Sequence, residues 1–518
     1  MSAIFVRGLR AAAFFAMAGS VLAGCNSTSA GGLSPIATAP STSQQLASFK
    51  QKINHIVIIY QENWGFDSLF GKFPGANGYS SATNITTQID ASGNPIATLP
   101  PVLNGGKPDP AFAAINTGNV PVAPFDIGSY VPTTGFTSDP NHNFYLQQAQ
   151  IDGGKMDRYL AYPGSGVGSL TFGYYDTTNF PEGKIAQQYV LMDNFHQSAF
   201  GGSFLNNIWA ACACTPQLPL SQIPPALVEP LDPSGAPAKL GGPEGRTTPD
   251  GYIVNTSFTT QYPQIVSGKP TIEFVPPLTN PTLGDKLTAA NVPWKFYSGG
   301  LDNALAGNPD PTFQAHHQSY LFFQNYAPGS AGASHIVDDT NFVKDLASGT
   351  LPAVSWVKAL GANNEHPAYA NLITGQMYVA NLIGQIQMSS AWKDTMIVVV
   401  YDEAGGHFDH VAPMPVDRFG PSTRVPAYIV SPFAKRGFID HSNYEVTSIL
   451  KTIELRFGLD ALSDRDAAAV PLLSPFDFTQ ATPSAFARQS LGALPRVPTA
   501  ILPLHYKNHP MTEVDYDE

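Results

Sequence analysis

Short runs of apolar, mostly β-branched residues recur along this chain, and helical patterns separate them. Residues 53–60 and 395–401 are two such runs. Apolar runs without polar alternation are typical of strands that are buried on both faces of a sheet. Helical periodicity over 372–388 and 444–457 indicates helices between and after the strands. Further strands are expected at 190–192, 352–357 and 425–430. The alternation predicts an α/β fold with a mainly parallel central sheet flanked by helices.

Two segments interrupt this rhythm, 84–137 and 215–281, and both are rich in Gly, Pro and Asn with few charges. Gly and Pro together are 92 of the 518 residues, which is below the roughly 25–30% that is typical of disordered low-complexity chains. We therefore interpret both segments as loop-rich insertions that cap the sheet. One catalytic domain is expected to span 49–518.

The amino-terminal residues resemble a targeting signal. Arg7 and Arg10 precede an apolar run at 11–23, which is shorter than the roughly 20 residues that a membrane span needs. Small residues precede Cys25, as at a bacterial lipoprotein processing site. The sequence predicts a lipoprotein-type signal peptide over 1–25, a lipidated Cys25 that contacts the membrane, and a flexible linker over 26–48. Export to the cell envelope follows, in the periplasm or at the outer membrane. An ordinary signal peptide and secretion are the alternative.

The net charge of −12 excludes a protein that binds nucleic acid through a broad basic face. Three cysteines exclude a disulfide-rich scaffold. Cys212 and Cys214 are separated by one residue, and a disulfide across so short a loop is strained. We expect two small, buried thiols, with a disulfide as the alternative.

Acidic and amide side chains directly follow two of the expected strands. Glu62 and Asn63 come after the first, and Asp402 and Glu403 come after the strand at 395–401. Because the carboxyl ends of parallel strands meet at one edge of a sheet, these four residues should converge there. Buried carboxylates repel one another, and a hard divalent cation removes that conflict. The alternative is that each pair caps the next helix.

The expected strand at 190–192 leads through Gly201 and Gly202 to Ser203, where a helix is expected to begin. A helix amino terminus offers free N–H groups and a positive dipole end to a phosphate. Ser203 is therefore either a nucleophile or a helix cap.

His142, His366 and His407 are expected near the same acidic edge. An imidazole there could steady a phosphoryl oxygen or protonate a leaving group. His316 and His317 have no such context, and we interpret them as loop residues.

An ordered series of motifs over about residues 50–460 resembles the phosphoesterase family of bacterial acid phosphatases and phospholipases C, in the alkaline-phosphatase-like superfamily. The motifs are QENWGFD at 61–67, DPNH at 139–142, GKMD at 154–157, DNF at 193–195, SFLN at 203–206, LPAVSW at 351–356, EHP at 365–367, VYDEAGGHFDHV at 400–411, GP at 420–421 and RVP at 424–426. Two departures from the family pattern are Trp64-Gly65 in place of Arg-Ser and Leu205 in place of Pro. We expect the first to alter the substrate rim and the second to alter how the nucleophile turn is held.

The resemblance implies an alkaline-phosphatase-like fold and one divalent metal ion, with Mg²⁺, Ca²⁺, Mn²⁺ and Zn²⁺ as candidates. It implies that the metal ligands are Glu62, Asn63, Asp402 and Glu403. Ser203 would be the nucleophile, and His142 and His366 would contact the transferred phosphoryl group. Asn206 and His407 are further candidates for substrate binding.

Hydrolysis of phosphate esters through a phosphoserine is the expected function, most like that of an exported acid phosphatase. Ser rather than Thr at the nucleophile position, and the short stretch of about 60 residues after Gly458, favour that branch over one with extra carboxyl-terminal domains. Two alternatives stay open. One is a phospholipase C that acts on phosphocholine-type lipids, and the other is an inactive, lipid-anchored binding protein. The sequence leaves the oligomeric state and the pH optimum undecided.

Overall fold

The computed structural model describes residues 42–82, 85, 87–233, 237–241, 244–266 and 274–480. The predicted signal peptide, Cys25 and most of the predicted linker lie outside these residues. Among the described residues, no helix combines the length and the apolar character that a membrane crossing requires.

An eight-stranded sheet forms the centre of the molecule, and its strand order is β11-β10-β12-β1-β13-β14-β6-β15. Only β14 runs antiparallel to its neighbours, so the sheet is mainly parallel, as predicted. The strands are β1 (His55–Gln61), β6 (Val190–Met192), β10 (Trp294–Ser298), β11 (Ile336–Asp338), β12 (Val354–Lys358), β13 (Thr395–Tyr401), β14 (Ala427–Val430) and β15 (Phe438–Asp440).

The first strand occupies the middle of this sheet. β1 lies between β12 and β13, with Gln61 paired to Tyr401 and Tyr60 paired to Lys358. Every residue of β13 is buried, which is why this strand reads as an unbroken apolar run. The register brings the residues after β1 next to those after β13, although about 340 positions separate them in the chain.

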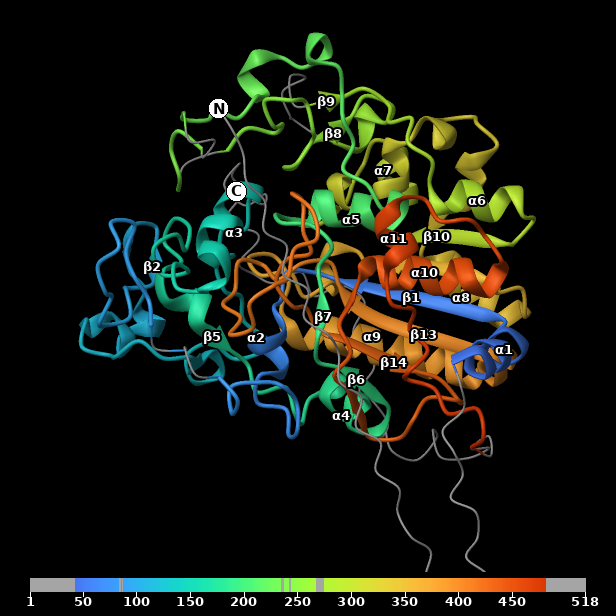
Figure 1. Cartoon of the computed structure of the whole chain (residues 1–518), viewed down its shortest axis with the longest axis horizontal. Helices are drawn as coiled ribbons and strands as arrows, with labels where there is room; N and C mark the ends of the chain where they lie inside the picture. The colour runs from blue at the N-terminus through green and yellow to red at the C-terminus, as the bar shows by residue number, and fades with distance from the viewer. Residues whose placement is uncertain are drawn as a thin grey trace, which may run out of the picture. The chain divides into compact units, whose positions relative to one another are not determined.

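Helices cover the sheet in two groups (Figure 1). α4 and α8 contact α9, whereas α1, α5 and α11 contact α10. The helices are α1 (Thr42–Lys52), α2 (Phe66–Phe70), α3 (Phe144–Ile151), α4 (Pro181–Gln188), α5 (Ser203–Cys212), α6 (Leu283–Ala289), α7 (Leu301–Leu305), α8 (Thr340–Ser348), α9 (Leu372–Met388), α10 (Val446–Phe457) and α11 (Asp464–Ala468).

The segments predicted as insertions contain only short elements where the structure describes them. The first holds β2 (Leu103–Asn104), β3 (Lys107–Pro108) and β4 (Phe125–Asp126), and the second holds β8 (Phe258–Thr259) and β9 (Phe274–Val275). In Figure 1, β1 runs from α1 towards the centre, and the segment around β2 and β5 (Gly173–Tyr174) lies beyond its far end. A parallel pair joins β4 to β5, and β5 contacts α2 at the end of β1. The remaining pair is β7 (Phe195–His196) with β16 (Tyr444–Glu445).

The predicted linker extends too far into the chain. α1 begins at Thr42, inside the predicted range 26–48. The helix forms because it carries an apolar side chain into the core: Phe49 is fully buried and its ring lies 5.3 Å from the ring of Phe476.

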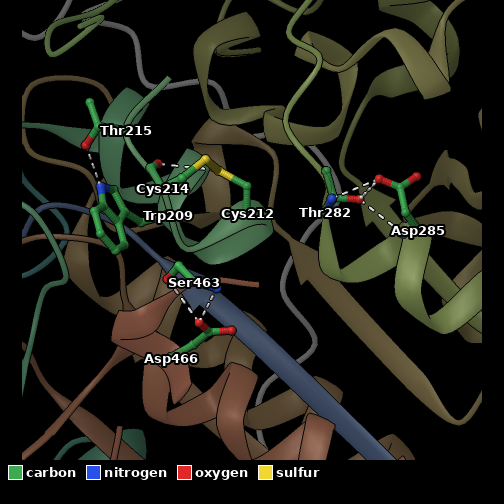
Figure 2. The surroundings of a disulfide bond; sticks show 8 residues. All are labelled: Trp209, Cys212, Cys214, Thr215, Thr282, Asp285, Ser463 and Asp466. Carbon is green, nitrogen blue, oxygen red and sulfur yellow. Dashed lines mark hydrogen bonds between the residues drawn. A yellow bond between two sulfur atoms is a disulfide. The ribbon is translucent and has the colours of Figure 1, made fainter. Parts of the chain in front are cut away.

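The expectation of two free thiols is wrong, because Cys212 and Cys214 form a disulfide (Figure 2). α5 ends at Cys212, and Ala213 adopts a left-handed conformation with φ 49° and ψ 39°. This single residue reverses the chain and brings the two Cα atoms to 5.2 Å, within the usual range for a disulfide. The sequence-based argument from loop strain did not anticipate the reversal at Ala213.

Candidate active site

Ser203 is the first residue of α5, and its hydroxyl lies against two of the predicted metal ligands. Ser203 Oγ is 3.0 Å from Glu62 Oε2 and 3.1 Å from Asn63 Oδ1, so its single proton can be donated to either oxygen. All three residues are fully buried. The structure thus joins the predicted nucleophile to the predicted metal site.

The register of β1 and β13 delivers the four predicted ligands to one place. Asp402 Oδ1 accepts hydrogen bonds from the backbone N–H of Asn63 at 3.3 Å and from that of Glu403 at 2.8 Å. Asn63 has a positive φ of 57°, which bends the chain sharply at the strand end. On its other oxygen, Asp402 accepts from Asn207 Nδ2 of α5 at 3.3 Å. Asp402 therefore links both strand ends to the helix that carries the nucleophile.

Three carboxylates are buried here with one ammonium group. Glu62, Asp402 and Glu403 are fully buried. Lys358, at the end of β12, forms an ion pair with Glu62 and is itself 1% exposed. Carboxylates therefore outnumber ammonium groups by three to one among these side chains, and the imidazoles of His142 and His317 border them. Burial raises the pKa of Asp402, and the nearby Lys358 charge acts in the opposite direction.

The imidazole of His142 lies between the nucleophile turn and the ligands. His142 Nδ1 donates to the Pro140 carbonyl at 2.6 Å, which directs Nε2 towards Asn63 Nδ2 at 3.4 Å and Glu403 Oε1 at 3.7 Å. A Cβ atom on Gly202 would come within 2.9 Å of this ring, so the residue before Ser203 has to be glycine for the imidazole to lie this close.

His366 enters the site from the segment after β12. Its Nδ1 contacts the Pro367 carbonyl at 2.6 Å, and its ring stacks on Tyr369 at 4.2 Å. The ring of His317 lies parallel to that of His366, with the centroids 6.2 Å apart. His317 Nδ1 is in turn 3.2 Å from Glu62 Oε1. His317 therefore contacts a predicted ligand directly, and His366 lies next to His317.

Sequence reasoning missed Lys358 and His317. His317 belongs to a buried 3₁₀ turn, Ala315–His317, and not to a surface loop. Nothing in the local sequence marks it, because Glu62 is more than 250 positions away. Lys358 could have been found, since it directly follows the predicted strand 352–357 and strand ends were already the criterion for the other ligands.

Asn206 is a predicted substrate contact, and its amide is engaged with the nucleophile turn. Its Oδ1 accepts from the Ala199 N–H at 3.0 Å, and its Nδ2 lies 3.1–3.3 Å from the carbonyls of Ala199, Gly201 and Gly202. These contacts fix the turn that presents Ser203. The substrate contact of Asn206 stays a prediction.

His407 stacks on Trp64 with 4.6 Å between the ring centroids, and both residues are 2% exposed. Burial lowers the pKa of His407 to about 3, with the charge of His142 adding to the effect, so the ring is neutral at physiological pH. Trp64 Nε1 donates to the Glu365 carbonyl at 2.9 Å. Trp64 is thus an interior side chain here, whereas its sequence position suggested a change at the substrate rim.

A second acidic group could also hold a cation. Ligand atoms of Asp67, Asp409 and His410 all lie within 4.8 Å of one another. Arg424 already lies against it, with Nη2 3.0 Å from Asp67 Oδ1 and 2.8 Å from Asp409 Oδ1. The positive charge of this guanidinium offsets negative charge of Asp67 and Asp409.

The donor chemistry of the Glu62 group fits a hard divalent ion. Three carboxylates, one amide oxygen and one hydroxyl are all oxygen donors, which suits Mg²⁺, Ca²⁺ or Mn²⁺. The excess of carboxylates over ammonium groups favours a cation among them.

Comparison with known proteins places this chain in a family. The sequence model of the Phosphoesterase family matches residues 53–460. Phospholipase C A of Mycobacterium tuberculosis is 26% identical over 501 residues, which cover 87% of this chain and 82% of that protein. Non-hemolytic phospholipase C of Burkholderia pseudomallei is 26% identical over 476 residues, which cover 82% of this chain and 57% of that protein.

Solved structures resemble the chain only weakly. A protein in the alkaline phosphatase superfamily from Vibrio parahaemolyticus has 12% identity and a TM-score of 0.29, over 65% of this chain and 72% of that one. A score this low supports no conclusion about the site.

Proposed function

Because this chain belongs to the phosphoesterase family and is a hydrolase of phosphoric ester bonds, we propose that Ser203 is its nucleophile and that a divalent metal ion assists the reaction. One observation supports this proposal above the others. The Ser203 hydroxyl lies 3.0 Å from Glu62 Oε2 and 3.1 Å from Asn63 Oδ1, at the centre of a fully buried group of oxygen donors.

In this proposal Glu62, Asn63, Asp402 and Glu403 would hold the ion, which would supply Lewis-acid stabilisation of charge on the phosphoryl group and on the Ser203 oxygen. The amino terminus of α5 offers its N–H groups to the phosphoryl oxygens. The ammonium group of Lys358 forms an ion pair with the Glu62 carboxylate. The turn held by Asn206 keeps Ser203 in line for attack.

Ser203 Oγ passes its proton to Glu62 Oε2, 3.0 Å away, and forms a bond to phosphorus while the bond from phosphorus to the leaving oxygen breaks. His366 or His142 donates a proton to that oxygen, and the substrate alcohol leaves. Water then attacks the phosphoserine, the phosphate product is released, and Ser203 regains its proton. The neutral His407 ring closes the side of the site beside Trp64.

Replacing the nucleophile tests this scheme. Ser203→Ala should lower turnover by several orders of magnitude with an unchanged circular dichroism spectrum, and the wild type alone should yield a trapped phosphoserine after acid quench. Ser355→Ala, which removes another buried hydroxyl from β12, is the matched control. Near-normal activity of Ser203→Ala would refute the nucleophile assignment.

Metal dependence needs a separate test. Dialysis against EDTA should abolish hydrolysis, and a panel of divalent ions should restore it and identify the physiological metal. Full activity after metal removal has been verified by elemental analysis contradicts the ion's role and leaves the test of Ser203 intact.

The preferred ester is the finer question. We favour an exported acid phosphatase from the sequence, while relatives named phospholipase C support the alternative. Comparing p-nitrophenyl phosphate with p-nitrophenyl phosphorylcholine decides between them. A preference of at least about tenfold in kcat/KM, which is about 1.4 kcal/mol in the transition state, identifies the branch.

We also propose export with lipidation at Cys25, which lies outside the described residues. Labelling cells with a radioactive fatty acid should mark the wild type, and Cys25→Ser should stay unlabelled. Equal labelling of both would show that Cys25 is not the acceptor.

A further inference from the structure

A second group of buried side chains lies directly beneath the candidate site. Glu182 of α4 and Glu365 are 0% and 1% exposed, and both carboxyl groups lie against the Tyr401 hydroxyl, at 3.3 Å and 2.7 Å. Two carboxyl groups this close in a buried site cannot both stay ionised, so the pair holds one proton.

The contacts assign that proton to Glu182. Glu365 Oε1 accepts from Gln61 Nε2 at 2.9 Å, and Glu365 Oε2 accepts from the Tyr401 hydroxyl at 2.7 Å. The same hydroxyl is 3.3 Å from Glu182 Oε2. A carboxyl group that accepts a hydrogen bond on each of its two oxygens is stabilised in its ionised form. Burial raises both pKa values, that of Glu365 to about 7 and that of Glu182 well above its usual range.

Each partner of Glu365 precedes a residue of the candidate site. Gln61 precedes Glu62, and Tyr401 precedes Asp402. Gln61 and Tyr401 are register partners on neighbouring strands, so their side chains share one face of the sheet. Glu365 itself precedes His366. One carboxylate thus ties together three of the segments that supply the site.

The backbone at Glu365 needs such an anchor. Its φ is +72°, in the left-handed region that is unfavourable for a residue with a side chain. Strained residues persist where their surroundings fix them. The side chain is held by the contacts above, and the carbonyl accepts from Trp64 Nε1. α9 also leaves room, because a Cβ atom on Gly375 would collide with Cγ of Glu365.

We propose that Glu365 is a positioning residue for the reaction: as the ionised half of a carboxyl pair with Glu182, it orients His366 for proton donation to the leaving alcohol. This inference rests on the proposed function. It assigns no contact with substrate to either glutamate.

Leaving-group dependence tests it. A p-nitrophenolate leaves without a proton, whereas an alkoxide needs one. Glu365→Gln keeps the shape of the side chain but turns an NH₂ group towards the donors Gln61 or Tyr401. It should lower kcat for an alkyl phosphoester about 10–100-fold, and lower kcat for the p-nitrophenyl ester of the same class less than threefold. KM should be unchanged for both esters.

Two further variants sharpen the result. Glu182→Gln replaces the proton-bearing partner with a neutral donor, so its loss on the alkyl ester should be at least fivefold smaller than that of Glu365→Gln. Glu454→Gln is the matched control, because burial also raises the pKa of Glu454, to about 8, and its carboxyl neighbour is Asp466 rather than a site residue. It should leave both rates unchanged.

The outcomes separate this inference from the proposed function. Equal losses on both esters, or equal losses in Glu182→Gln and Glu365→Gln, overturn the positioning role while Ser203→Ala still reports on the nucleophile. If Glu365→Gln is insoluble, Tyr401→Phe serves in its place, because it removes one donor to Glu365. It should lower kcat more for the alkyl ester than for the p-nitrophenyl ester, by a smaller factor than Glu365→Gln. Equal rates for the two esters relative to the wild type overturn the proposal. If the wild type hydrolyses neither ester, the proposed function fails and this inference with it.

Discussion

Two buried acidic groups in this protein differ in how their charge is compensated. Around Arg424, the carboxylates of Asp67 and Asp409 contact a guanidinium that is itself fully buried. Around Glu62, three carboxylates are buried, and the ammonium group of Lys358 forms an ion pair with one of them, Glu62. Counted as ionised, the first group has two carboxylates for one guanidinium, and His410 Nδ1 lies 2.6 Å from Asp67 Oδ2. The second has three carboxylates for one ammonium group, and the imidazoles of His142 and His317 border it.

This difference between the two groups distinguishes a structural contact from a candidate site for chemistry. A buried charge without a partner costs several kcal/mol, so a deficit persists only where something else supplies the charge. Arg424 also donates to the carbonyls of Asn77 and Asp193, and so joins three segments. We interpret the Arg424 group as a structural link and the Glu62 group as a site for an ion.

Removing the arginine should give the largest change in stability. Arg424→Met leaves two buried carboxylates without their partner, and we expect a loss of about 3–5 kcal/mol in the free energy of unfolding. Urea denaturation measures it. Arg418→Met is the control, because Arg418 pairs with Asp250 at the surface, where both side chains are about half exposed, and such pairs contribute about 0–1 kcal/mol. Similar losses in both variants would contradict the structural role of Arg424.

Adding the metal should stabilise the protein through one group only. At a free ion concentration of 100 times Kd, the wild type should gain about 2.7 kcal/mol. Asp402→Asn should lose this gain, whereas His410→Gln, in the Arg424 group, should keep it. Thermal unfolding with and without the ion measures both. The opposite pattern would place the ion at Asp67, Asp409 and His410, and would reverse the interpretation of the two groups.

Acid should weaken both regions through one buried histidine in each. Burial lowers the pKa of His196, near Arg424, to about 4 and that of His407 to about 3. The folded state favours the neutral ring, so stability is complete above the ordinary histidine pKa of 6.5 and falls as the pH drops from there towards the folded value. Each ring should cost about 2 kcal/mol between pH 7 and pH 5.

Denaturation at both pH values checks this. His407→Phe preserves the stacking on Trp64 and should reduce the loss by about 2 kcal/mol. An unchanged slope in His407→Phe would show that this ring is protonated in the folded protein.

The strands of the sheet centre could be predicted because they are apolar from end to end. Residues 395–401 became β13 without a shift, and 372–388 became α9. Away from the centre of the sheet, the strands lack this unbroken apolar pattern. β10 mixes Lys295 with aromatic residues, and β11 and β15 have three residues each, so all three were missed. Edge strands are short and partly exposed, and their composition is close to that of loops.

The residues of the candidate site also divide into those that a local sequence pattern marked and those that it did not. Glu62, Asn63, Asp402 and Glu403 follow strands, and Ser203 begins a helix, so local patterns marked them. His317, Glu182 and the Cys212–Cys214 disulfide had no such signal. The first two act through partners more than 180 positions away, and the third depends on one left-handed residue.

The sequence by itself determined an α/β chain with oxygen ligands at its strand ends and a serine at a helix start, because periodicity and strand termination are local properties. The tertiary structure alone decided which charges are compensated. That depends on distances between residues far apart in the chain, and buried electrostatic interactions change steeply over a few ångströms. Lys358 beside Glu62 and Arg424 beside Asp409 are both contacts between a basic and an acidic side chain. Only the other charges around each contact distinguish the ion site from the structural link.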